Sequence, residues 1–195
     1  MNLFLPEQIL AIHTEFDKGN VPHAFGGAIA LAYYGQPRAT YDIDINIALP
    51  VEQHGRVLDC LTSLFPIENR ARVEGEIMRS TQTRLRWEYI PVDLFFADIP
   101  FHESIAARSR EVEFAGTKIP IISAEDLIIC KAAYNRGKDW PDIENIFRVQ
   151  GMNLDFGYLR HWLDEFFPPD NERIGKIERH IRDCGRSNDT SHDKT

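Results

Sequence analysis

The stretch "TYDIDINI", residues 40–47, places two aspartates one residue apart among isoleucines. Strands are normally poor in Asp, but β-branched residues at every second position favour a strand. Because side chains i and i+2 of a strand share a face, the isoleucines would face a core, and Asp42, Asp44 and Asn46 would share the opposite face. Two neighbouring carboxylates repel each other unless a cation neutralises them, and Mg²⁺ prefers such oxygen ligands. The stretch predicts a metal-binding strand; the alternative is the solvated face of an edge strand.

A glycine pair precedes this strand. In "FGGAIALAYYG", residues 25–35, Gly26 and Gly27 stand between an expected short strand and an expected helix. Glycine lets the backbone approach a ligand closely, and a helix N-terminus offers unpaired N–H groups and the positive end of a dipole. The pair predicts a phosphate cradle; the alternative is a tight turn that needs glycine for its own conformation.

A third acid follows later in the chain. "PVDLFFA", residues 91–97, carries Asp93 alone in an apolar strand, where the alternative is a strand-end residue that faces water. Phosphoryl-type transfer can use carboxylates that hold metal ions bridging the attacking and leaving oxygens. A glycine turn, a D-x-D strand and a lone acid on a later strand form a minimal set for that chemistry.

Composition excludes several other classes of protein. The chain has 195 residues, 43% hydrophobic and 27% charged, which is ordinary for one globular domain with at most a small appendage. A net charge of −8 argues against broad DNA coating. Three scattered cysteines, no transmembrane-length apolar run and no signal-peptide pattern predict a cytoplasmic protein without membrane partners. The lone histidines show no ligand spacing and are expected to be structural or surface residues.

The order of elements predicts an α/β (α+β) fold. Residues 1–122 would form a mixed sheet flanked by helices, residues 123–184 a C-terminal helical region, and residues 185–195 a disordered tail with almost no apolar side chains. After the helix expected to end before Pro66, the pattern predicts β-rich sequence through "RLRWEYI", residues 84–90, and "PVDLFFA", residues 91–97.

Five arginines in residues 69–87 indicate either a charge-mixed surface or a basic path for RNA. They are Arg70, Arg72, Arg79, Arg84 and Arg86, interspersed with Glu74 and Glu76.

Together, "GGAIALAYYGQPRATYDIDINI" resembles the signature of the polymerase-β-like nucleotidyltransferase superfamily, with Asp93 in the place of its third acid. Many members carry Gly-Ser where this chain has Gly26-Gly27, so backbone groups would replace a serine hydroxyl. "SAEDLIICKAAYNRGKDWPDIENI" resembles the segment after the sheet in the AbiEii-type toxin branch, as does "PRAT" through Arg38 and Thr40. Matching positions in the later segment are Lys131, Arg136, Lys138, Asp139 and Asp142. The resemblance spans residues 22–147.

This resemblance implies an enzyme that moves an NMP from an NTP such as ATP to an acceptor hydroxyl, using Mg²⁺ or Mn²⁺. Asp42, Asp44 and Asp93 would be the catalytic metal ligands, and Asp93 would also act as general base. The nucleotide-binding residues would be Gly26, Gly27, Arg38, Thr40, Lys131 and Asp139.

The AbiEii branch further implies the toxin of a toxin–antitoxin pair, with an RNA such as tRNA, or a protein, as acceptor and an antitoxin as partner. Two alternatives stay open. One is transfer to a small hydroxyl compound, as in aminoglycoside or lincosamide nucleotidyltransferases. The other is a non-catalytic nucleotide-binding module.

Overall fold

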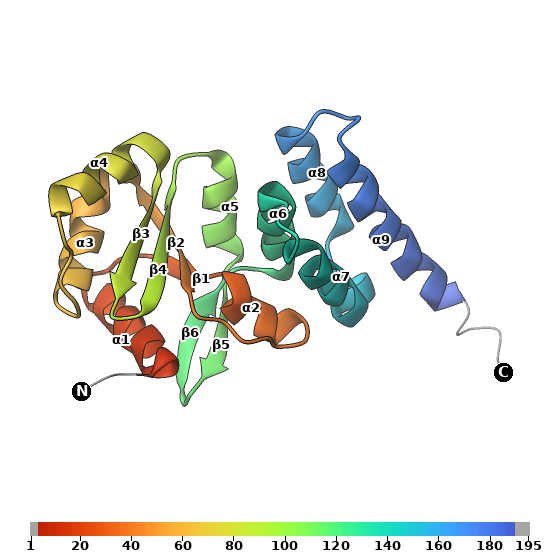
Figure 1. Ribbon diagram of the computed structural model, residues 1–195. Helices are drawn as coiled ribbons and strands as arrows, with labels where there is room; N and C mark the ends of the chain where they lie inside the picture. The colour runs from red at the N-terminus through yellow and green to blue at the C-terminus, as the bar shows by residue number, and fades with distance from the viewer. Residues whose placement is uncertain (1–3, 190–195) are drawn as a thin grey trace. The chain divides into compact units, whose positions relative to one another are not determined.

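A computed structural model of the protein describes residues 4–189 (Figure 1). The chain divides into two compact units, Met1–Ile29 with Ala39–Ser123, and Ala30–Arg38 with Ala124–Thr195. The predicted boundary after residue 122 lies one residue from this division. Ala30–Arg38, however, joins the helical unit rather than the sheet unit that surrounds it in sequence.

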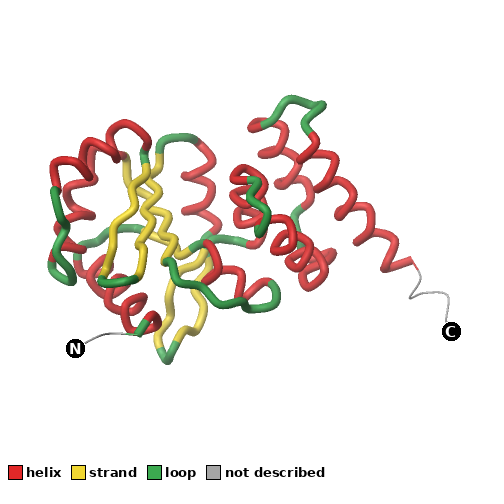
Figure 2. Tube along the Cα trace, viewed as in Figure 1, coloured by secondary structure: helices red, strands yellow, loops and turns green. Residues whose placement is uncertain are grey.

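The first unit contains the sheet. Its elements are α1 (Leu5–Lys18), β1 (His23–Phe25), the start of α2 (Gly27–Tyr34), β2 (Ile43–Pro50), a 3₁₀ turn (Val51–Gln53), α3 (His54–Thr62), α4 (Arg70–Ser80), β3 (Gln82–Trp87), β4 (Ile90–Ala97), α5 (Pro100–Arg108), β5 (Arg110–Phe114) and β6 (Thr117–Ile121). Figure 2 shows the strands in yellow, with helices α1 and α3 on one side and α5 on the other.

The six strands are ordered β3-β4-β2-β1-β6-β5. β2 runs parallel to β4, and β1 runs parallel to β6, whereas the β1–β2, β3–β4 and β5–β6 pairs are antiparallel. The predicted mixed sheet flanked by helices is therefore confirmed.

The alternation predicted for β2 is present. Ile43 and Ile45 are fully buried and Ile47 is 1% exposed, while Asp44 and Asn46 on the other face are half-buried. Burying an isoleucine side chain stabilises a fold by roughly 1.5 to 3 kcal/mol, so this row anchors the strand and orients the acids away from the apolar core.

The two stretches predicted to be β-rich form β3 and β4, but the segment before them contains helix α4, which was not predicted. Asn69 begins it in a left-handed conformation, and its side chain accepts a hydrogen bond from the Arg72 N–H at 3.2 Å. Arg70 pairs with Glu74 one turn on, as Arg72 does with Glu76. Arginines spaced by i,i+4 from glutamates support a helix, which is why this charge-rich segment is not a strand.

The second unit is helical. It contains the rest of α2, then α6 (Ala124–Tyr134), α7 (Asp139–Gln150), a 3₁₀ turn (Gly151–Asn153), α8 (Phe156–Phe166) and α9 (Glu172–Asp189). α6 packs on α7 and α8, and α9 packs on the same two helices. The predicted tail, residues 185–195, overlaps α9 as far as Asp189, and residues 190–195 lie outside the described part. No helix within residues 4–189 is long and apolar enough to cross a membrane.

Candidate active site

Three acids meet at one end of β2 and β4 in the first unit. The parallel register pairs Asp44 directly with Asp93, on strands about 4.8 Å apart. Asp42 precedes β2 by one residue; continued alternation would give it the face of Asp44, and the charges of both acids act on Arg84. The structure therefore brings together the three acids that the sequence singled out.

Thr40 holds the first of these acids. Its hydroxyl donates a hydrogen bond to the Asp42 carboxylate. The Asp42 backbone N–H in turn donates to the Thr40 hydroxyl oxygen, at an N···O distance of 3.4 Å. Thr40 was predicted to bind nucleotide; in this structure its hydroxyl orients a carboxylate of the acid cluster.

Arg84 holds the third acid. Arg84 faces Asp93 in the β3–β4 register, and its Nε–H and Nη2–H each donate to one carboxylate oxygen at 2.6 Å. The hydrogen bonds to Asp93, then its charge, raise the pKa of Arg84, with smaller contributions from Asp42 and Asp44. The sequence indicated either a charge-mixed surface or an RNA path for Arg84 and did not predict this pairing. The two-residue connection after Trp87 was the available signal, because it sets the hairpin register.

The glycine pair lies against Asp44. The Gly26 N–H donates to the Asp44 carbonyl at 2.9 Å. Gly27 has φ of +51°, and a Cβ there would overlap the Asp44 carboxylate. Only glycine meets both demands, since L side chains rarely adopt this conformation. The Asp44 carboxylate therefore lies beside Gly27, the first residue of α2. The positive end of a helix dipole at this N-terminus favours a negative charge there.

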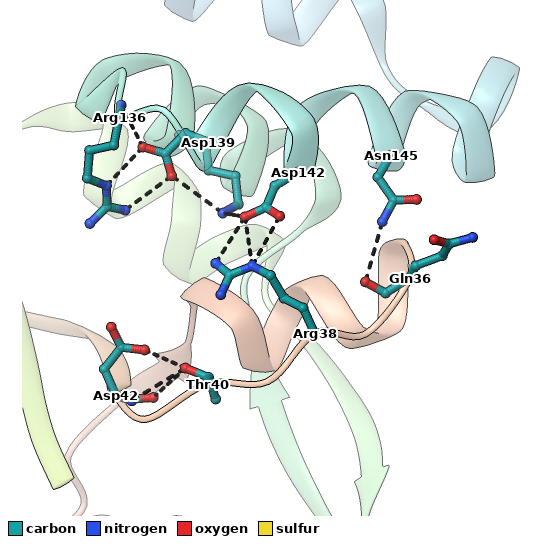
Figure 3. A network of polar contacts seen from close by, with 9 residues as sticks. Gln36, Arg38, Thr40, Asp42, Arg136, Asp139, Asp142 and Asn145 are labelled. Atoms are coloured by element: carbon teal, nitrogen blue, oxygen red, sulfur yellow. Dashed lines mark hydrogen bonds and ion pairs between the residues drawn. The ribbon is translucent and has the colours of Figure 1, made fainter.

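Lys131 lies in the second unit, on α6, and is buried at 3% exposure. Its Nζ donates to Asp142 at 2.6 Å and lies 3.7 Å from Asp139. Figure 3 shows these carboxylates on α7 as the centre of a polar network. An amino group this buried requires polar partners, and Asp139 and Asp142 supply them.

Two arginines complete this network (Figure 3). Arg38 donates to both oxygens of Asp142 at 3.0–3.3 Å, and Arg136 donates to both oxygens of Asp139 at 2.9–3.2 Å. Burial opposes ionisation of Asp142, but hydrogen bonds from Arg38 and Lys131 outweigh it and lower its pKa. The sequence pattern placed Asp142 in the motif but indicated no role for it. In the structure it is the carboxylate that both Arg38 and Lys131 contact.

The predicted residues thus form two groups. The acids, the glycine pair and Thr40 belong to the first unit, whereas Arg38, Lys131 and Asp139 belong to the second. The acid group suits a hard divalent cation, since carboxylate oxygens converge from neighbouring strands beside a helix N-terminus. Asp42 and Asp44 would hold such an ion, with Asp93 available once Arg84 releases an oxygen.

Comparisons with known proteins agree with this arrangement. The sequence profile of the nucleotidyl transferase AbiEii toxin family, type IV toxin–antitoxin system, matches residues 9–193. A comparison with curated proteins finds no match.

Solved structures with a similar fold include antibiotic-modifying proteins. The solution structure of the antibiotic-resistance factor ANT(2'')-Ia aligns with a TM-score of 0.53 at 17% identity, covering 91% of this chain and 96% of that one. The lincomycin-bound lincosamide antibiotic adenylyltransferase LnuA aligns with a TM-score of 0.52 at 17% identity, covering 76% and 99%. At these identities the likeness concerns the fold.

Proposed function

Because the chain belongs to the AbiEii nucleotidyltransferase toxin family, we propose that it transfers an NMP from an NTP to an acceptor hydroxyl with release of pyrophosphate. The observation that carries this proposal is the register of Asp44 with Asp93, with Asp42 on the same face and Gly27 against Asp44. Three carboxylates beside the Gly26–Gly27 backbone support a site at which that backbone would hold phosphate. A plain structural strand has no need of either feature.

The metal chemistry is assigned to the acid cluster. Asp42 and Asp44 would hold Mg²⁺, which when bound neutralises charge on the triphosphate and on the leaving pyrophosphate. Thr40 orients Asp42 through its hydroxyl. The Gly26–Gly27 backbone would approach the phosphates, because no side chain intervenes at the start of α2.

Asp93 would take the proton of the acceptor hydroxyl as the new P–O bond forms and the bond to pyrophosphate breaks. Both of its oxygens accept hydrogen bonds from Arg84, so one of these bonds has to open first. The Arg84 side chain is 62% exposed, so water can solvate the guanidinium when that bond opens.

We assign the acceptor to a cleft beside Arg84. It measures about 640 Å³ and is lined by Arg72, Arg84, Arg86 and Trp87 among others. Exposed arginines next to the acids suit a phosphate-bearing acceptor, so RNA is the acceptor we favour. The family also implies an antitoxin that controls the enzyme.

A small hydroxyl compound is the second candidate acceptor. The cleft volume lies in the range of small-molecule sites, and its lining mixes the arginines with Glu68 and Glu88. Those carboxylates suit a cationic compound better than RNA, which gives the alternative a physical basis.

A labelling experiment tests the reaction. The protein is incubated with Mg²⁺ and each α-³²P-labelled NTP, together with total cell RNA, a protein lysate or candidate small hydroxyl compounds. Label should enter RNA with the wild type and with Asp59→Asn, an exposed carboxylate on α3. Asp42→Asn and Asp44→Asn should each lower transfer by about 100-fold or more, the scale seen when a catalytic electrostatic contact is lost. Equal transfer by these variants and wild type would refute the assignment.

A further inference from the structure

A second cluster of ligand-type side chains lies in the first unit, away from the acids. His13 and Asp17 are one turn apart on α1, and His23 begins β1. His13 Nδ1 lies 3.1 Å from His23 Nε2, and His13 Nε2 lies 3.5 Å from an Asp17 oxygen. Both histidines are only 8% exposed, whereas Asp17 is exposed.

The hydrogen bonds of His23 define its tautomer. Its Nδ1 lies 2.8 Å from the Val21 carbonyl oxygen. A carbonyl only accepts, so Nδ1 carries the proton and Nε2 presents a lone pair toward His13. Metal-binding histidines commonly donate their other N–H to a backbone carbonyl in this way, which orients the ring.

We propose that His13, Asp17 and His23 form a site for a transition-metal ion of the zinc class. One ligand atom from each residue lies within 4.8 Å of the other two. Ligand atoms of a tetrahedral zinc site are about 3.3 Å apart when each bond is 2.0–2.2 Å. The two histidine nitrogens, 3.1 Å apart, already meet this spacing. The exposed Asp17 side chain can rotate to bring its oxygen to the same distance from them.

The nitrogen ligands determine the class of ion. Imidazole suits Zn²⁺, Co²⁺, Ni²⁺ and Cu²⁺, whereas Mg²⁺ prefers oxygen ligands and suits the acid cluster. A neighbouring cavity of about 210 Å³, lined in part by Asp17 and His23, leaves room for a water molecule as a fourth ligand. The site would tie α1 to the start of β1.

This cluster is separate from the acids. β1 is antiparallel to β2, and His23 pairs with Ile47, three residues along β2 from Asp44. At about 3.4 Å per residue this places the two sites about 10 Å apart along the strand. Zinc binding at the histidines is therefore testable without the proposed transfer reaction.

The competing explanation is a metal-free hydrogen-bonded chain from Asp17 through His13 and His23 to Val21. A metal-binding measurement distinguishes the zinc site from this metal-free chain. Metal-stripped protein is titrated with Zn²⁺ by calorimetry, and Co²⁺ binding is followed by its visible absorption spectrum. Wild type should bind one Zn²⁺ with a Kd below about 10 μM, a moderate value for three protein ligands. The Co²⁺ spectrum should show the intense bands of tetrahedral coordination.

Matched variants locate the ion. His13→Gln and His23→Gln should each weaken Zn²⁺ binding about 100-fold or more, since a ligand is lost. Asp17→Asn should weaken it about tenfold. His54→Gln is the control, because His54 Nδ1 also contacts a backbone carbonyl, that of Val51 at 2.8 Å. Asp42→Asn, in the acid cluster, should also leave the zinc affinity unchanged.

Absence of zinc binding to wild type would overturn the proposal, as would unchanged affinity in both histidine variants or loss of the site in Asp42→Asn. Circular dichroism checks the fold of each variant. If a histidine variant fails to fold, the exposed Asp17→Asn variant and the Co²⁺ spectrum of wild type still decide. A spectrum without tetrahedral bands, together with wild-type affinity in Asp17→Asn, would refute the site.

Discussion

Arg84 and Asp93 face each other across the β3–β4 hairpin, and the guanidinium donates one 2.6 Å hydrogen bond to each carboxylate oxygen. Such a fork is among the stronger polar contacts in proteins. The guanidinium charge offsets the negative charge of Asp93, which is only 8% exposed and lies directly beside Asp44. The same contact competes with any metal ion for the oxygens of Asp93.

Arg84→Ala should therefore destabilise the metal-free protein and strengthen its response to Mg²⁺. Without the two hydrogen bonds, Asp93 would repel the neighbouring acids. The free energy of unfolding should fall by about 1 to 2 kcal/mol, which corresponds to a Tm lower by about 2–8 °C. Added Mg²⁺ should raise the Tm of this variant more than that of wild type. Thermal unfolding with and without Mg²⁺ measures both effects. Arg86→Ala, on the same strand, is the control, and an identical Mg²⁺ response in all three proteins would contradict the competition.

Gly27→Ala should abolish nucleotide binding and destabilise the fold. The added methyl group would overlap the Asp44 carboxylate, and φ of +51° is strained for alanine, so a loss of about 1–3 kcal/mol is expected. Gly75→Ala is the matched control: Gly75 lies within α4 with open space around its Cα, and the change should be neutral or stabilise by up to about 1 kcal/mol. Urea unfolding and Mg²⁺-ATP binding provide the measurements. Normal ATP affinity in Gly27→Ala would argue against the cradle.

Asp142 should make the helical unit sensitive to acid. Its lowered pKa means that the folded state binds this proton less readily than the unfolded chain. Its contribution is thus fully present above the unfolded pKa near 3.8 and is lost as pH falls through the lower folded value. Asp142→Asn should cost about 3 kcal/mol at neutral pH, because Lys131 loses its closest partner, and the difference from wild type should shrink below about pH 4. Urea unfolding from pH 7 to pH 3 tests this, with Asp164→Asn on the exposed side of α8 as control. A constant difference across that range would contradict the linkage.

Arg86 should contribute to RNA binding through a phosphate contact. It is exposed on the same face of β3 as Arg84 and lines the cleft proposed for the acceptor. Removing one contact to single-stranded RNA should reduce the slope of log K against log salt by about 0.7. Salt-titrated binding of wild type and Arg86→Ala measures it. Arg110→Ala, on the opposite edge strand β5, should keep the wild-type slope; equal slopes for all three would remove Arg86 from the RNA path and favour a small acceptor.

Much of the acid site could be predicted from local sequence. Alternation in residues 42–47 is a property of neighbouring side chains, so it indicates both the strand and the common face of Asp42 and Asp44. The glycine pair is similarly local, because the φ of +51° at Gly27 limits the choice of residue. Helix α4 was missed although its Asn69 cap and its i,i+4 charge pairs were visible, since the flanking strands dominated the interpretation of that segment.

The sequence by itself determined the D-x-D strand and the sheet-then-helix order, because both follow from periodicity along the chain. Only the tertiary structure decided which distant groups meet. Strand register set Arg84 against Asp93, helix packing buried Lys131 between Asp139 and Asp142, and the turn from α1 to β1 brought His13 to His23. Such pairings depend on how the elements dock, so the chain carries only partial signals for them, such as the short β3–β4 connection that sets the register of Arg84 with Asp93.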